Sequence, residues 1–247
     1  MIILKNEQEI ELLANAGRVA GLCLKMLGSK VRPGITTAEL DRMAEEFIRG
    51  MGAIPTFKGY NGFPASICTS VNDEVVHGTP DSRRLEEGDI ISIDVGATLN
   101  GFVGDTAATF PVGRVSPLAE RLIQATRESL YAGIAAAVEG KTVGDIGHAV
   151  ESVVRRYGFT VVRDYAGHGV GRSMHEDPSV PNFGLPGTGP VLRRGMVIAI
   201  EPMVNAGGYE VITFRNLKVV TKDGSLSAHF EHTVAVTPGG PRCLTQV

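Results

Sequence analysis

The sequence predicts an α+β protein made of two related α/β halves. Segments with amphipathic helical spacing alternate with segments rich in β-branched residues along all 247 residues. A faint internal repeat relates the first half, roughly 1–115, to the second, roughly 116–247. No long linker or low-complexity tract separates the halves. We therefore expect residues 1–247 to form a single domain.

Four amphipathic helices are expected, each beginning near a side chain that can cap it. In the first, Asn6 is a suitable N-cap, and apolar or small residues from Ile10 to Ala20 fall near one face. In the second, Leu40 and Ile48 belong to an apolar series with the same spacing. The predicted helices span residues 6–28, 37–51, 116–137 and 143–157.

Six strands are expected where β-branched residues cluster or alternate. They span residues 65–70, 90–95, 102–110, 196–201, 210–220 and 229–236. The turn sequence LNGF separates the second from the third. These two strands should therefore form a hairpin.

The repeat is carried by two pairs of segments at nearly the same separation. Residues 31–53 align with 137–159, and LEEGDIISIDV (85–95) aligns with LRRGMVIAIEP (192–202). The second alignment places Asp94 opposite Glu201. A half that is duplicated and folded twice around a pseudo-twofold axis predicts a central site with similar ligands from each half.

Composition narrows the class of partner. The net charge of −3 gives no basic surface for a polyphosphate, so DNA is not expected as a partner. No apolar run approaches the roughly 18 residues of a membrane helix, and the first apolar run is too short for a signal peptide. The three cysteines, Cys23, Cys68 and Cys243, are far apart, which suits a reducing compartment. We expect a cytoplasmic protein without a membrane partner.

Four carboxylates stand on or at the end of apolar strands. They are Asp94 in DIISIDVG, Asp105 in GFVGDTAATF, Glu201 in MVIAIEP and Glu231 in SAHFEHTVAV. A buried carboxylate requires a partner, and two close carboxylates repel unless a cation or a proton lies between them. For Asp94, Glu201 or Glu231 taken alone, a structural role, in a turn or on a solvated strand face, is an equally good interpretation.

Two histidines, His168 and His175, lie in the glycine-rich stretch AGHGVGRSMHEDP. Carboxylates with imidazole suit Mn, Fe(II), Co or Zn. Four carboxylates exceed the needs of one ion and fit a two-metal site, which carries out metal-assisted hydrolysis. Serine-nucleophile, P-loop, HExxH and dinucleotide-binding motifs are absent. His77, at a strand-to-turn boundary, is by itself more simply explained as structural.

These residues in their local contexts resemble the metal ligands of the methionine aminopeptidases. The resemblance covers nearly the whole chain. The matching motifs are NGFPASICTSVNDEVVHGTP, IDVG, GDTAATF, GHGVGRSMHEDP, AIEPMV and SLSAHFEHTVAVT. The family has the pita-bread fold, in which two pseudo-symmetric α/β halves surround a central antiparallel sheet with a dinuclear metal site.

The resemblance implies a role for each residue. Asp94 would chelate one of two divalent ions (Co, Mn, Fe(II) or Zn), Asp105 and Glu231 would bridge both, and His168 and Glu201 would complete the second. Glu201 would also shuttle a proton. The catalytic set would be His77, His175 and Glu201, with the two histidines contacting the substrate and steadying the tetrahedral intermediate.

The family's methionine pocket also matches position by position. The matching residues are Phe57, Tyr60, Phe63, Cys68, His77, Met174 and Leu217, with His175 beside them. Leu217 replaces a common tryptophan, and Met174 stands where an aromatic residue is frequent. These departures bear on the shape of the pocket and on its tolerance of side chains other than methionine.

The resemblance further implies a short, type I bacterial enzyme that removes the N-terminal methionine of nascent polypeptides in the cytoplasm. The ribosome is left open as a second partner, and nothing requires more than a monomer. Two alternatives remain: a related X-Pro aminopeptidase or prolidase, and a non-enzymatic pita-bread protein that binds RNA or protein partners.

Overall fold

Four helices begin at side chains that accept a hydrogen bond from their first turn. The computed structural model describes residues 1–247. It contains α1 (Glu7–Gly28), α2 (Thr37–Gly50), α3 (Pro117–Ala136) and α4 (Val143–Arg156). The N-caps are Asn6, Thr36, Ser116 and Thr142, and three of them form complete capping boxes. All four predicted helices are confirmed, with ends that differ by one residue at most.

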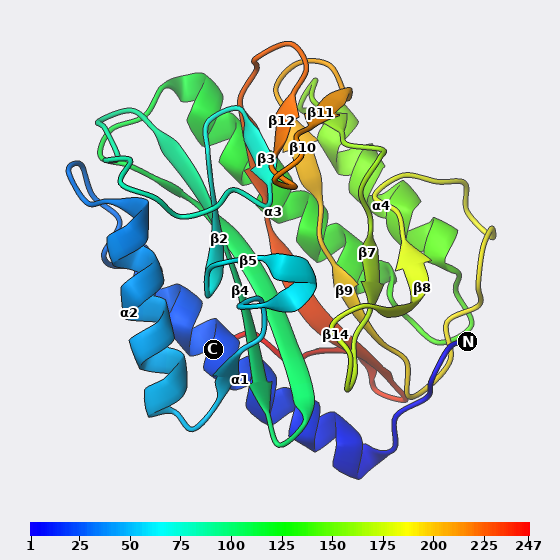
Figure 1. The fold of residues 1–247 in the computed structure, drawn as a ribbon. Coiled ribbons are helices and arrows are strands. Elements are labelled where there is room, and N and C mark those ends of the chain that lie inside the picture. The colour runs from blue at the N-terminus through cyan, green and yellow to red at the C-terminus, as the bar shows by residue number, and fades with distance from the viewer.

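A nine-stranded antiparallel sheet forms the centre of the molecule (Figure 1). Its main path runs β1-β4-β5-β14-β9-β7-β8, with β2 on β4 and β15 on β14. The strands are β1 (Ile54–Pro55), β2 (Ile67–Val71), β4 (Ile90–Leu99), β5 (Phe102–Pro111), β7 (Gly167–Gly169), β8 (Glu176–Val180), β9 (Val197–Ile200), β14 (Glu231–Thr237) and β15 (Gly240–Cys243).

Two three-stranded sheets complete the β structure. One has the order β13-β10-β6 and the other β11-β12-β3. These strands are β3 (Glu74–Val76), β6 (Thr160–Val161), β10 (Met203–Asn205), β11 (Val211–Thr213), β12 (Val219–Thr221) and β13 (Ser227–His229). A short 3-10 turn, η1 (Tyr60–Gly62), precedes β2.

The predicted β4–β5 hairpin is confirmed. Its ladder runs from Ile90 paired with Pro111 to Leu99 paired with Phe102. Asn100 and Gly101 form the turn with φ values of 52° and 76°. Positive φ at both central residues is the two-residue turn that matches the twist of the strands.

Two predicted strands were wrong in extent. The segment 210–220 is a hairpin of β11 and β12, because the chain reverses where the Phe214 N–H donates to the Lys218 carbonyl at 2.9 Å. The segment 229–236 divides between β13, which ends at His229, and β14, which starts at Glu231. The two strands belong to different sheets.

Equivalent contacts recur in the two halves. Gly34 and Gly140 have φ values of 88° and 86° and precede the caps of α2 and α4. The N–H of Gly34 donates to Leu85 and that of Gly140 to Leu192, at 2.7 and 2.9 Å. These four residues are the ones that the repeat aligns. The pita-bread arrangement of two pseudo-symmetric halves around an antiparallel sheet is therefore confirmed.

The helices pack on the face of the sheet opposite the site. A Cβ at Gly104 of β5 would lie less than 3.0 Å from the backbone of Gly17 in α1, so helix and strand are in direct backbone contact. Successive side chains point to opposite faces of a strand, so Asp105 points away from α1. None of the helices combines the length and apolar character needed to cross a bilayer.

Candidate metal centre

Three carboxylates lie on one face of the central sheet because of its register. Asp94 in β4 pairs with Ala107 in β5, and Glu231 in β14 pairs with the same Ala107 from the other side. Asp105 lies two residues from Ala107 along β5, which places it on the same face. It pairs with Gly96, also two residues from Asp94. The predicted approach of Asp94 and Asp105 is thus diagonal across the hairpin.

His168 and Glu201 reach the same face from the second half. His168 is the middle residue of β7, which pairs with β9, and Glu201 follows directly after β9. His168 Nε2 lies 3.5 Å from Glu201 Oε1 and 3.8 Å from Asp105 Oδ2. Its Nδ1 lies 2.9 Å from the Gly169 carbonyl oxygen, so a proton on Nδ1 leaves Nε2 as a lone-pair donor toward the carboxylates.

The glycines around His168 provide room between strands. A Cβ at Gly167 would lie less than 3.0 Å from the Ala199 carbonyl, and a Cβ at Gly169 would be equally close to the Asp177 carbonyl. Neither glycine has a positive φ. Glycine is needed at both positions because neighbouring backbone approaches closely, and not because the chain adopts an unusual conformation there.

Burial and mutual repulsion shift the carboxylate pKa values. Burial, followed by repulsion from neighbouring carboxylates, raises the pKa of Asp94 and Glu231 well above the usual range. Burial raises the pKa of Asp105 to about 6 although His168 lowers it. Burial also acts to raise the pKa of Glu201, but a hydrogen bond with His229 and the nearby His168 outweigh it, and that pKa is lowered.

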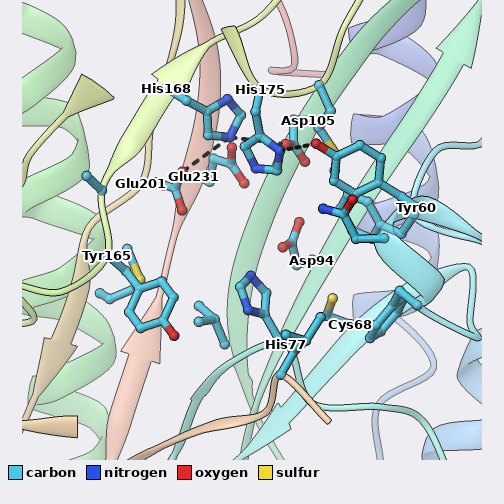
Figure 2. A pocket seen from close by; sticks show the side chains of 18 residues that line it. Tyr60, Cys68, His77, Asp94, Asp105, Tyr165, His168, His175, Glu201 and Glu231 are labelled. Atoms are coloured by element: carbon cyan, nitrogen blue, oxygen red, sulfur yellow. Dashed lines mark hydrogen bonds and ion pairs between the residues drawn. The ribbon is translucent and has the colours of Figure 1, made fainter. Parts of the chain in front are cut away.

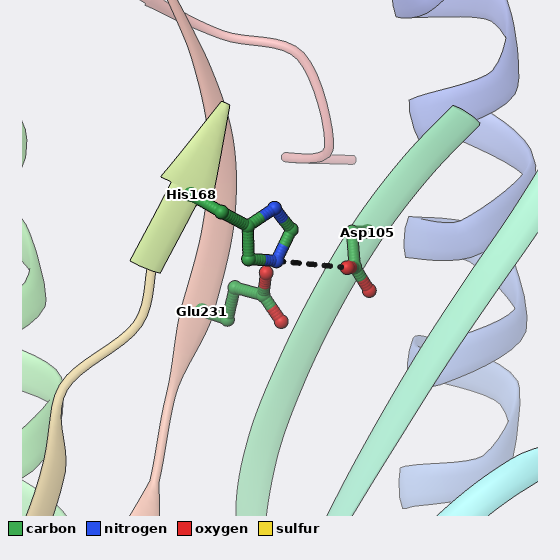
Figure 3. Close-up of side chains that lie close together, drawn as sticks. All are labelled: Asp105, His168 and Glu231. Atoms are coloured by element: carbon green, nitrogen blue, oxygen red, sulfur yellow. Dashed lines mark ion pairs between the residues drawn. The ribbon is translucent and has the colours of Figure 1, made fainter. Parts of the chain in front are cut away.

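The donor set fits a divalent cation. Asp94 Oδ1, Asp105 Oδ1 and Glu231 Oε1 are buried without any hydrogen-bond partner. One ligand atom each from Asp105, His168 and Glu231 can be chosen so that all lie within 4.8 Å of one another (Figure 3). Unpartnered buried carboxylate oxygens are costly, and a hard or borderline cation among them removes that cost.

All of the predicted site residues line a single cavity of about 190 Å³. Figure 2 shows His168 and His175 on one side of it and His77 on the other, with Asp94 between them. The predicted pocket positions form its less polar part: Phe57, Tyr60, Phe63, Cys68, Met174 and Leu217. Leu217 lies near the tip of the β11–β12 hairpin and is 45% exposed, so this wall is at the cavity's mouth.

The two further histidines face the cavity as neutral rings. Burial, and then the neighbouring His168, lowers the pKa of His175 to about 4. Burial lowers the pKa of His77 as well. His175 Nδ1 lies 2.8 Å from the Tyr60 hydroxyl, and its ring centroid is 4.2 Å from that of His168. A neutral imidazole can donate a hydrogen bond to a carbonyl oxygen.

Sequence reasoning did not single out His229, beside the cavity, or five residues that line it: Asn61, Val76, Tyr165, Ala166 and Met203. His229 is buried, and its Nε2 lies 3.6 Å from Glu201 Oε2. The signal was its place two residues before Glu231 in SAHFEH, which suggests the same side of a strand. Tyr165 lines the cavity and packs edge-on against His77, with centroids 5.8 Å apart. No pattern in the sequence around Tyr165 indicates this contact.

Comparison with known proteins identifies a family for the whole chain. The model of metallopeptidase family M24 matches residues 11–238. A methionine aminopeptidase of Clostridium perfringens is 57% identical over 100% of both chains. Methionine aminopeptidase 1 of Bacillus subtilis is 53% identical, also over 100% of both. The crystal structure of a methionine aminopeptidase from Thermotoga maritima superposes with a TM-score of 0.98 at 43% identity, over 100% of both chains.

The chain belongs to metallopeptidase family M24, in the branch formed by the methionine aminopeptidases.

Proposed function

We propose that the protein is an aminopeptidase that removes the N-terminal methionine of polypeptides by metal-assisted hydrolysis of the first peptide bond. The observation that carries this is the joining of two features in one cavity. Buried carboxylates with unpartnered oxygens lie beside His168, and an apolar wall with sulfur and aromatic groups lies next to them. The relatives named above support this activity over that of an X-Pro hydrolase or a binding protein.

The five residues that would hold the metal are Asp94, Asp105, His168, Glu201 and Glu231. We infer two divalent ions, Co, Mn, Fe(II) or Zn, because four carboxylates exceed what one ion needs. When bound, such ions act as Lewis acids toward the scissile carbonyl and lower the pKa of water. The free amine of the substrate would also bind there, which restricts cleavage to the first residue of a chain.

Glu201 is placed to move a proton. Its carboxylate lies at the edge of the cluster, and its lowered pKa keeps it ionised at neutral pH. It can therefore accept a proton from the attacking water and deliver it to the leaving amine. His229 Nε2 at 3.6 Å and the Asn182 side-chain amide, which donates to the Glu201 carbonyl at 3.0 Å, restrict its position.

His77 and His175 would hold the reacting peptide bond from opposite sides. Because both are neutral, each can present an N–H to a carbonyl oxygen on which negative charge develops. The Tyr60 hydroxyl accepts from or donates to His175 Nδ1 and so orients the ring. Because Tyr60 occupies Nδ1, the orientation of Nε2, the opposite ring nitrogen of His175, is set by this hydrogen bond.

The methionine side chain would occupy the less polar part of the cavity. Phe57, Phe63, Cys68 and Met174 are buried and present aromatic and sulfur surfaces. Such surfaces suit a flexible thioether. Leu217 at the mouth is smaller than an aromatic residue, so we infer tolerance of side chains slightly larger than methionine.

The partners would be nascent polypeptides in the cytoplasm, on or near the ribosome, with the enzyme acting as a monomer. The cavity is small, about 190 Å³, and the composition of the chain is not strongly basic. Free N-termini of new chains are the substrates that match this chemistry.

Turnover of Met-Ala-Ser with each of Co(II), Mn(II), Fe(II) and Zn(II) tests the proposal. We expect release of methionine from Met-Ala-Ser, no cleavage of its N-acetylated form, and no cleavage of Ala-Pro. The matched control is Glu201→Gln, which should lose activity. Absence of release with every ion, or equal cleavage of the acetylated peptide, would refute the proposal.

A further inference from the structure

A buried ion pair involves Glu176, the residue that follows His175 in the chain. Lys5 Nζ is 2.5 Å from Glu176 Oε2, and the two side chains are only 4% and 9% exposed. Burying two charges carries a desolvation cost that a pair of apolar side chains would avoid. Neither residue lines the cavity. Because the pair is costly to bury and does not line the cavity, we look for its role in holding the structure around the site.

The backbone of Lys5 is hydrogen-bonded to the segment that leads into the central sheet. The backbone N–H of Lys5 donates to the Gly195 carbonyl at 2.7 Å, just before β9. Its ammonium also donates to the Ile3 carbonyl at 3.0 Å. Because β9 leads to Glu201, Lys5 is anchored to the same sheet that carries the candidate metal ligands.

The glutamate closes the turn that carries His175. Glu176 follows His175 and opens β8, where it pairs with Gly169, the neighbour of His168. Its Oε1 accepts a hydrogen bond from the Ser173 N–H at 3.3 Å. A Cβ at Gly171 would lie less than 3.0 Å from this carboxylate, so the glycine leaves the space that it occupies.

We propose that the Lys5–Glu176 ion pair is a tether that positions His175 over the reacting bond. The Tyr60 hydroxyl fixes the ring of His175 from the cavity side. The tether fixes its backbone by joining the turn at residues 171–176 to the segment that immediately precedes β9. Lys5 and Glu176 are positioning residues, and this inference rests on the proposed contact of His175 with substrate.

The test is a double-mutant cycle between Lys5 and His175. Lys5→Met keeps the length of the side chain and removes its charge. We expect it to lower kcat for Met-Ala-Ser roughly 10-fold, because small displacements of a catalytic group are costly, while KM changes little. Affinity for Mn(II), measured by calorimetry, should not change. In a His175→Ala background, the same change should alter kcat by less than about 2-fold.

Two further variants and a control separate positioning from folding. Lys5→Arg keeps the charge and should recover most of the activity. Lys5→Met with Glu176→Gln leaves no unpaired buried charge, so it should fold even where Lys5→Met alone does not, and still show the fall in kcat. Arg194→Met removes an exposed ion pair with Glu7 in the same region and should behave as the wild type.

Hydrogen exchange gives a readout that does not depend on activity. Amides of residues 171–176 should exchange faster in Lys5→Met than in Arg194→Met. Wild-type kcat in Lys5→Met, unchanged exchange, or a full additional loss in the His175→Ala background would overturn the tether. If the wild-type protein releases no methionine, the proposed function fails, and exchange alone still decides whether the tether holds the turn.

Discussion

Asp94 and Glu231 flank the same residue, Ala107, from opposite sides at one level of the central sheet. The small side chain of Ala107 leaves the two carboxylates facing a shared space. Burial, followed by repulsion from Asp105 and Glu201, holds the pKa of both acids high. The metal-free protein must therefore keep protons on them or accept repulsion between them.

The metal-free protein should lose stability as the pH rises from 6.5 to 8. The raised pKa values of Asp94 and Glu231 mean that the folded state holds more protons than the unfolded chain, so the free energy of unfolding falls with rising pH. The slope is up to about 1.4 kcal/mol per pH unit for each group. The three histidines whose pKa is lowered, His77, His175 and His232, partly oppose this slope, because their imidazoles are still half protonated at pH 6.5 in the unfolded chain; this opposing contribution fades above about pH 7.5. Urea unfolding at both pH values measures the slope.

Asp94→Asn should make this pH dependence shallower and raise the stability of the metal-free protein at pH 8. Mn(II) should raise the melting temperature of the wild type more at pH 8 than at pH 6.5. Asp223→Asn is the control, because the pKa of Asp223 is about 2 and its carboxylate is ionised throughout this range. Equal slopes for the wild type and Asp94→Asn would contradict this prediction.

His168 and His77 should differ in their effect on metal affinity. His168→Ala removes a candidate ligand and should weaken Mn(II) binding by more than the roughly 10–100-fold typical of outer-shell changes. His77→Ala should leave the metal bound and lower kcat by about 10²–10³, the cost of losing one donor to a developing charge. Calorimetry and Met-Ala-Ser turnover distinguish the two. Loss of metal in His77→Ala would show that the roles are wrongly divided.

Leu217→Gly should stabilise the protein and widen its selectivity. Leu217 has a φ of 70°, a conformation that costs a bulky residue about 1 kcal/mol or more and costs glycine nothing. Removing this wall should also reduce the preference for methionine over bulkier side chains. Unfolding free energy and kcat/KM for a peptide series measure both effects. Leu185→Gly, at an exposed leucine without positive φ, should instead destabilise.

Gly169→Ala should be strongly destabilising, although it adds only one methyl group. The new Cβ would lie less than 3.0 Å from the Asp177 carbonyl on the paired strand, where backbone cannot yield cheaply. A loss of about 1–3 kcal/mol is expected, with weaker metal binding because His168 is the adjacent residue. Gly50→Ala is the matched control: nothing lies within 4 Å of its Cβ, and it should be neutral or stabilising.

Helices were predictable because their signals lie within a few residues of one another. Asn6 with Glu9, and Thr36 with Glu39, form capping boxes that involve no other part of the chain. The β4–β5 hairpin was predictable for the same reason, since Asn100 and Gly101 alone define its turn. Strands as short as β7, with three residues, have no such local signal.

The residues of the site likewise divide into those that local sequence signals predicted and those that they did not. Residue type, the burial expected from apolar strands and the resemblance of local motifs pointed to the candidate ligands and to most of the cavity walls. They did not point to Tyr165, which lines the cavity, or to His229, which lies beside Glu201. Those two were missed because their contacts, with His77 and Glu201, join segments far apart in the chain.

The sequence by itself determined the helices, the β4–β5 turn and the kinds of side chain that could bind a metal, since each depends on neighbours along the chain. Only the tertiary structure decided that Asp94 and Glu231 meet across Ala107 and that Lys5 reaches Glu176. These contacts depend on strand register and on packing between distant segments. Their free energy is gained only when the whole sheet has formed, so no short stretch of sequence encodes them.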